Sequence, residues 1–117
     1  MLTVGPETVN ALETLKQKKK FVEDVTLLYP GAPDETTRVN AEDIINAGLS
    51  ELIVASKNVV TEERFWMILE TTARRLSEMD SEEMDRGLAY MEEIMDIYGI
   101  KSSGGRLNEW RYGFDPS

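Results

Sequence analysis

The 117-residue chain has the size of a single domain, and its 41% hydrophobic and 30% charged residues are typical of a globular protein with one packed core. The 22 acidic and 13 basic residues give a net charge of −9, which disfavours contact with phosphate backbones and anionic lipid headgroups. Cysteine is absent, which excludes disulfides and thiolate metal sites and favours a reducing compartment.

A first helical segment is predicted to begin at Pro6, because proline is favoured in the first turn of a helix. Its apolar pattern continues past a run of lysines to the motif YPGAP at residues 29–33, so the segment is one helix or two. The apolar residues are Ala11, Leu12, Leu15, Phe21, Val22, Val25 and Leu28. The lysines, Lys18, Lys19 and Lys20, are expected to form a solvated helix face, because short basic runs usually do.

A second and a third helix follow, and each has a capping residue. Asp34 is expected to cap the second helix, and Thr61, which precedes two glutamates, the third. Gly48 lies within the apolar stripe of the second helix and predicts a close contact with another helix. The second helix buries Ala41, Ile44, Ile45, Gly48, Leu49, Leu52 and Ala55, and the third buries Phe65, Ile68, Leu69, Thr72, Ala73, Leu76 and Met79.

A fourth helix is predicted to begin with Ser81 as its cap and to stop at a left-handed Gly99. Its core face is Met84, Gly87, Leu88, Met91, Ile94, Met95 and Tyr98. Short connections between amphipathic helices favour antiparallel packing. We therefore predict an all-α fold, a single helical domain over residues 1–117. It is a bundle of four or five amphipathic helices with an irregular aromatic tail over residues 101–117.

The sequence predicts no catalytic, cofactor-binding or metal-binding residue. Histidine is absent, which excludes imidazole bases and the Glu-x-x-His ligands of di-iron bundles, and no P-loop is present. The sequence also shows neither a secretion signal nor a stretch long and apolar enough to span a bilayer. We expect a cytoplasmic protein that binds no nucleic acid, no membrane and no cofactor.

Acidic residues concentrate on the fourth helix, opposite its core face. At about 100° per residue, they form one strip with Arg86 as its only basic neighbour. The strip contains Glu82, Asp85, Glu92, Glu93 and Asp96. The helix dipole favours acidic residues in the first turn, but Glu92 and Asp96 are like charges one turn apart near the opposite end.

The flank of this strip carries Tyr90 and Ile97, seven residues apart. Together with the carboxylates they are expected to form a mixed acidic and apolar patch that suits a basic protein partner. Ordinary solvated surface is the alternative explanation.

The same helix supports an enzymatic alternative. Carboxylates one turn apart bind magnesium in helical nucleotide pyrophosphatases, and Glu93 with Asp96 resembles half of that family's pattern. The other half places a third glutamate one turn after a doubled one, and Glu62 and Glu63 have no such partner.

The tail is the densest aromatic segment of the chain. Trp110, Tyr112 and Phe114 alternate, so an extended chain would place the three rings on one side. Because large aromatic residues of small domains are usually buried, we expect the tail to fold back over the open end of the bundle. Alternatively, Trp110, Arg111 and Tyr112 anchor a partner.

The run YMEEIMDIYGIKSSGGRLNEWRYGFDP, which begins at residue 90 and ends at residue 116, resembles the C-terminal signature of a small bacterial family named domain of unknown function 4844. The motif YPGAP resembles an upstream position of the same family. The resemblance implies a bacterial origin and a helical fold, and it assigns no activity to any residue.

Two classes of function follow from the sequence. The first is a protein-binding inhibitor, such as an immunity protein or antitoxin that blocks a basic toxin or nuclease, because such inhibitors are often small, acidic and helical. The second is the magnesium-dependent hydrolase. An adaptor or dimerisation module without catalytic activity is a third possibility.

Overall fold

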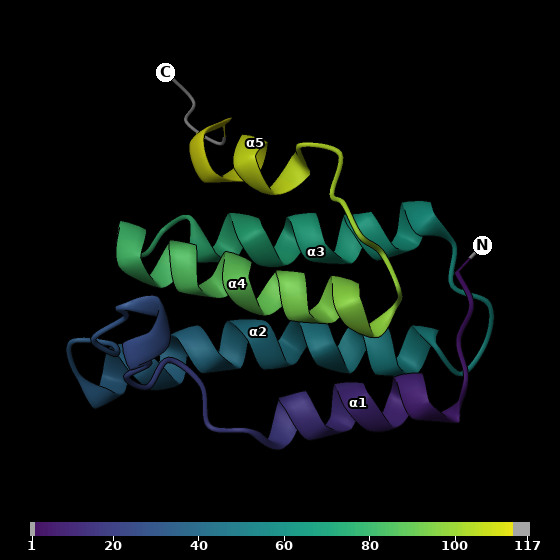
Figure 1. Ribbon diagram of the computed structural model, residues 1–117, viewed down its shortest axis with the longest axis horizontal. Coiled ribbons are helices and arrows are strands. Elements are labelled where there is room, and N and C mark those ends of the chain that lie inside the picture. Colours follow the sequence, from purple (N-terminus) through teal and green to yellow (C-terminus); the bar gives the residue numbers. More distant parts are fainter. Residues whose placement is uncertain (1, 114–117) are drawn as a thin grey trace.

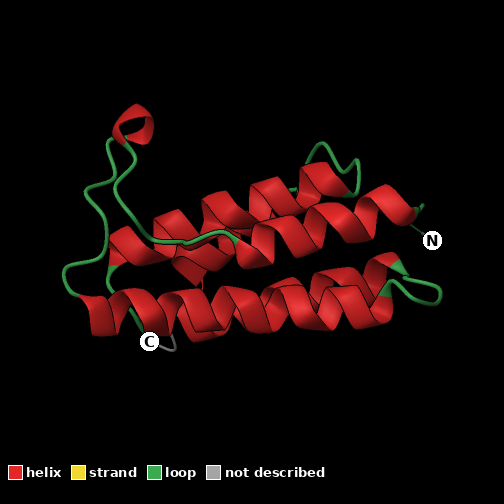
Figure 2. Ribbon diagram, turned by 90° about the horizontal axis from the view of Figure 1, so that it is seen from below, coloured by secondary structure: helices red, strands yellow, loops and turns green. Residues whose placement is uncertain are grey.

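The structure, a computed structural model, describes residues 2–113, and within this range the chain is helical (Figures 1 and 2). The elements are α1 (Pro6–Gln17), the short 3-10 helix η1 (Val25–Leu27), α2 (Glu35–Ala55), α3 (Glu62–Leu76), α4 (Ser81–Ile97) and α5 (Arg106–Gly113). The predicted all-α bundle is confirmed. No helix of the described residues is both long and apolar enough to cross a membrane.

The four longer helices run roughly parallel or antiparallel and form two layers, as Figure 2 shows. The helix α2 packs against α1, α3 and α4, and α5 packs against α3 and α4. Figure 1 shows α5 alongside α3, at the outer side of the bundle. Most residues of the predicted core faces of α2, α3 and α4 meet in one buried cluster, whereas Ile44, Ala55 and Met79 are only partly buried and pack against it. At the α2–α3 contact, a methyl group added to Gly48 would lie 2.6 Å from Thr72 Oγ1, so the predicted close helix contact is confirmed.

The helix ends follow the sequence signals closely. Asp34 Oδ1 accepts a hydrogen bond from the backbone N–H of Thr37 at 2.7 Å, and Thr61 Oγ1 accepts one from Arg64 at 3.1 Å. Ser81 is the first residue of α4 rather than its cap, because the cap position belongs to Asp80. Gly99 has a φ of 73° and ends α4 as predicted.

The first segment departs from the predicted pattern, because α1 ends at Gln17 and the chain reaches η1 through a loop. Of the apolar residues that continue the helical spacing, Phe21 is buried, whereas Val22, Val25 and Leu28 are exposed. Tertiary contacts hold this loop, since the backbone N–H of Phe21 donates to Tyr90 Oη at 2.9 Å.

Lys20 contradicts the expected solvated lysine face, although Lys18 and Lys19 are exposed. The Lys20 side chain is fully buried, and its Nζ donates to the carbonyl oxygens of Lys16 at 3.0 Å and Lys18 at 2.8 Å. It therefore caps the C-terminal end of α1. Desolvation lowers the pKa of Lys20, and the nearby carboxylate of Glu42 opposes this shift.

The prediction of an irregular tail is wrong for residues 106–113, which form α5. Residues two apart on a helix point in nearly opposite directions, so the rings do not share one side. Trp110 is buried at 5% exposure and Tyr112 is 69% exposed. Phe114 lies outside the described residues.

Candidate functional site

The acidic strip of the fourth helix is exposed along the length of α4. Its members, Glu82, Asp85, Glu92, Glu93 and Asp96, are all accessible to solvent, while the opposite face of α4 contributes to the core. The strip therefore lies on the face that the helical periodicity predicts.

Two members of the strip have basic neighbours that the sequence did not indicate. The guanidinium of Arg111, on α5, pairs with the carboxylate of Asp85. The charge of Glu93 acts on the buried ammonium of Lys20. Within residues 2–113, no ion pair forms at Glu82, Glu92 or Asp96. These three carboxylates are the part of the strip that remains open to a partner.

Arg86 turns away from the acidic strip, contrary to its predicted place beside the carboxylates. Its side chain is only 10% exposed, and Nη1 donates to Asp24 Oδ2 at 3.1 Å. The guanidinium carbon lies 4.7 Å from the ring centroid of Tyr90 and 5.5 Å from that of Tyr29. Arg86 thus holds the loop that precedes η1 against α4 and pairs with no carboxylate of the strip.

Tyr90 is not part of the exposed surface, so its predicted role in partner binding is wrong. It is 1% exposed, its Oη accepts the hydrogen bond from Phe21, and the two ring centroids lie 5.2 Å apart. The loop before η1 covers this flank of α4, which the helical wheel alone cannot reveal. Ile97 is half-buried and packs against the core cluster.

Glu83 is also buried, at 2% exposure, although acidic residues in a first turn are usually solvated. Its Oε2 accepts a hydrogen bond from the hydroxyl of Tyr29 at 3.0 Å. Burial and this neighbouring carboxylate raise the pKa of Tyr29. The pair forms a second attachment to α4 of the segment between α1 and α2, residues 18–34, which we call the η1 loop.

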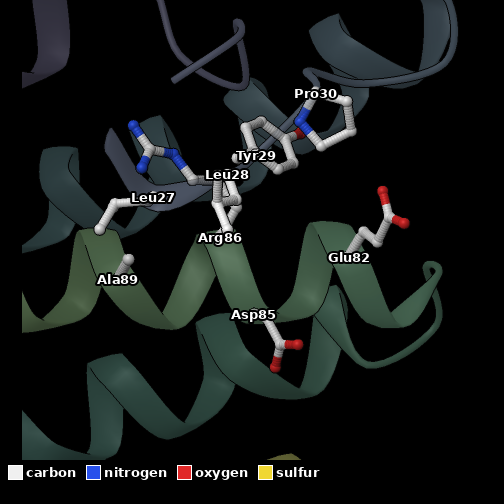
Figure 3. Close-up of a pocket in the computed structure, with 8 residues that line it drawn as sticks. All are labelled: Leu27, Leu28, Tyr29, Pro30, Glu82, Asp85, Arg86 and Ala89. Carbon is white, nitrogen blue, oxygen red and sulfur yellow. The ribbon is translucent and has the colours of Figure 1, made fainter. Parts of the chain in front are cut away.

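A groove separates η1 from the N-terminal half of α4 (Figure 3). Leu27, Leu28, Tyr29 and Pro30 line one side, and Glu82, Asp85, Arg86 and Ala89 line the other. Its volume is about 260 Å³. The apolar part of the site therefore comes from the η1 loop, rather than from Tyr90 and Ile97.

Sequence reasoning missed this groove because the apolar residues around η1 fit a helical spacing. A local signal was available in Asp24 and Thr26, since an aspartate that precedes a hydroxyl residue by two positions favours a turn. In the structure, Asp24 Oδ1 accepts from the backbone N–H of Thr26 at 3.1 Å and from its hydroxyl at 2.6 Å.

The three predicted site residues of α5 do not lie on one face of the helix. Arg111 lies with its guanidinium 4.8 Å from the ring centroid of Tyr112, and both residues line a second hollow with Asp85 and Glu92. Trp110 points the other way, and its ring centroid lies 6.3 Å from that of Trp66. The fold therefore gathers Asp85, Glu92, Arg111 and Tyr112 and leaves Trp110 to the core.

The carboxylates of the enzymatic alternative do not gather into a cluster. In the part of the chain that the structure describes, no group of three or more acidic side chains is placed to hold a metal ion. Glu92, Glu93 and Asp96 point outward along one helix. They form an exposed anionic surface.

The comparisons with known proteins support the same fold. Residues 3–115 match the family described as a domain of unknown function (DUF4844). The chain belongs to the DUF4844 family. The resemblance of its C-terminal segment to that family is thereby confirmed.

A solved structure shows that the DUF4844 chain shares its architecture with another family. A protein of the DUF3571 family from Acinetobacter baumannii aligns with a TM-score of 0.80 and 24% identity, over 92% of this chain and 89% of the other. This similarity establishes the fold and assigns no activity. Among curated proteins, no significant match was found.

Proposed function

We propose that this chain is a cytoplasmic, non-catalytic protein-binding domain, and that the acidic strip of α4 binds a basic surface of its partner. The observation that carries the proposal is the exposure of Glu82, Glu92 and Asp96 without an ion pair within the described residues. Lysine and arginine side chains are the complement of such a surface.

Local stability does not account for Glu92 and Asp96, whereas the helix dipole favours Glu82 in the first turn of α4. Glu92 and Asp96 are one helical turn apart, and like charges at this spacing destabilise a helix by about 0.2 to 0.5 kcal/mol. Asp96 also lies in the last turn of α4, where the helix dipole disfavours an anion. On α3, by contrast, residues at the same spacing have opposite charges: Arg74 Nη2 lies 3.9 Å from Glu70 Oε1.

An inhibitor such as an immunity protein or antitoxin is the partner-binding class that this surface suits best. An anionic face on a small helical domain can cover the basic active site of a toxin or nuclease. This finer assignment rests on analogy of charge and size. An adaptor would use the same strip without blocking an active site.

The test is a pull-down from a bacterial lysate over a salt series. The variant Glu92→Gln, Glu93→Gln, Asp96→Asn should retain less of a basic partner than the wild type. Its thermal midpoint should stay about equal, because relief of the repulsion between Glu92 and Asp96 opposes the loss of the Glu93 charge near Lys20. The matched control, Glu7→Gln, Asp43→Asn, Glu51→Gln, removes the same charge from α1 and α2 and should retain the partner fully.

Two results would contradict the proposal. One is equal capture by the wild type and the α4 variant at every salt concentration. The other is magnesium-dependent hydrolysis of a nucleotide by the wild type that the α4 variant lacks, because this outcome would assign the same carboxylates to metal catalysis.

A further inference from the structure

We propose that the groove between η1 and α4 binds one apolar side chain of the basic partner, while a lysine or arginine of the same partner segment meets Glu82 at the rim. This inference rests on the proposed function, because it names the part of the partner that the acidic face would recognise. It adds the η1 loop as the apolar half of the interface.

The η1 loop presents three apolar side chains to solvent. Val25 is 72% exposed, Leu27 is 61% exposed and Leu28 is 90% exposed. Isolated apolar residues are common on protein surfaces, but a contiguous group at the edge of a groove is typical of an interaction site. Leu27 and Leu28 both line the groove.

The loop is held in one shape before any partner arrives. Asp24 and Tyr29 exchange two backbone hydrogen bonds of 2.9 Å, and Asp24 also accepts from Thr26. The bonds from Tyr29 to Glu83 and from Arg86 to Asp24 fix the base of the loop to α4. A preformed loop loses little conformational entropy on binding, which favours recognition.

Backbone conformation does not explain the leucine at position 28. Leu28 has a φ of 55°, in the left-handed region that glycine and asparagine adopt more easily. Its side chain contributes almost nothing to the core, because it is 90% exposed. Neither backbone conformation nor core packing favours leucine here, and its position on the groove makes its side chain available to a partner.

The charges around the groove select the partner. Glu82 is exposed on the α4 side, and Asp85 lies next to it with Arg111 as its partner. The one cation of the lining, Arg86, is committed to Asp24. An apolar wall beside exposed carboxylates suits a segment that carries both an apolar and a basic residue.

The groove is smaller than most small-molecule sites. Its volume of about 260 Å³ lies below the range of about 300 to 1,000 Å³ that small-molecule sites usually occupy. An anionic membrane and a second copy of this acidic chain would both meet repulsion from Glu82 and its neighbours.

The experiment selects a library of 12-residue peptides displayed on phage against the wild-type protein at low salt. Enriched peptides should combine an aliphatic or aromatic residue with a lysine or arginine within one helical turn. They should bind Leu28→Asn at least tenfold more weakly, although asparagine suits the left-handed backbone and the thermal midpoint should not fall. Val59→Asn is the control, since Val59 is 62% exposed and belongs to the α2–α3 connection. Figure 1 shows this connection at the opposite end of the bundle from the segment between α1 and α2, so the change should leave peptide binding unchanged.

The outcomes separate this inference from the proposed function. The groove is not the binding site if the enriched peptides lack an apolar residue close to a lysine or arginine. The same conclusion follows if the peptides bind Leu28→Asn as tightly as the wild type. If these peptides instead lose affinity for the Glu92→Gln, Glu93→Gln, Asp96→Asn variant, the acidic strip keeps its role without the groove. Binding to phosphatidylglycerol vesicles or formation of a dimer, lost in Leu28→Asn, would also overturn it, since either occupant would differ from a basic protein segment.

Discussion

Trp110 is predicted to be the residue that holds α5 on the bundle. It is the buried residue of this helix, and its ring meets Trp66, whose face also receives the Arg106 guanidinium at 4.4 Å. Replacement of a buried tryptophan by alanine costs about 3 to 5 kcal/mol of unfolding free energy. An isolated helix of eight residues is not stable in water, so α5 should detach when this anchor is lost.

Two different changes should have equal effects on stability if α5 detaches when Trp110 is lost. Trp110→Ala and a chain that ends at Gly105 should lose the same unfolding free energy to within about 1 kcal/mol, because both remove the packing of α5. Urea unfolding followed by far-ultraviolet circular dichroism measures both values. Tyr112→Ala is the control, since Tyr112 is 69% exposed and its removal should cost less than about 1 kcal/mol.

The prediction also decides between the two hypotheses for the tail. If Trp110→Ala lowers the unfolding free energy by less than about 1 kcal/mol, Trp110 does not hold α5 on the bundle. A tail that contributes nothing to stability, but whose removal abolishes capture of a partner, would be an interface. A truncation that costs far more than Trp110→Ala would show that other α5 residues carry the docking.

Two further predictions concern the loop anchor and the helix contact. Burial and Glu83 raise the pKa of Tyr29 above its usual value of about 10. The unfolded chain therefore releases this proton at a lower pH than the folded chain does. The unfolding free energy should consequently fall as the pH rises above about 10. Urea unfolding between about pH 8.5 and 11 should show a shallower fall in Tyr29→Phe, and an identical slope would refute the burial of this hydroxyl. Gly48→Ala should lower the unfolding free energy by about 1 to 3 kcal/mol, because the added methyl group would contact Thr72 Oγ1. Adding Thr72→Ala to this variant should remove most of that loss. A double variant whose loss equals the sum of the two single losses would contradict the contact.

The sequence alone determined the long helices and their buried faces. Caps and apolar periodicity act within a few residues, so Asp34, Thr61 and Gly99 could be assigned from their neighbours along the chain. The exposure of the acidic strip follows from the same periodicity, because the face opposite a core stripe points to solvent.

Tertiary structure decided the segment between α1 and α2. Phe21, Val22, Val25 and Leu28 fit a helical spacing, but Glu42 Oε1 accepts from the backbone N–H of Lys20 at 2.8 Å and Tyr90 accepts from Phe21. These bonds join residues far apart in sequence and replace the bonds that a continued helix would have made. No local pattern encodes such partners.

The same reason explains the candidate site. The sequence places Glu82, Arg86 and Tyr90 on one helix, but it does not show that the η1 loop covers Tyr90, draws Arg86 toward Asp24 and leaves Glu82 beside a groove. Periodicity gives the direction of a side chain from its own helix. What lies in that direction depends on how distant segments pack, and this packing created the groove.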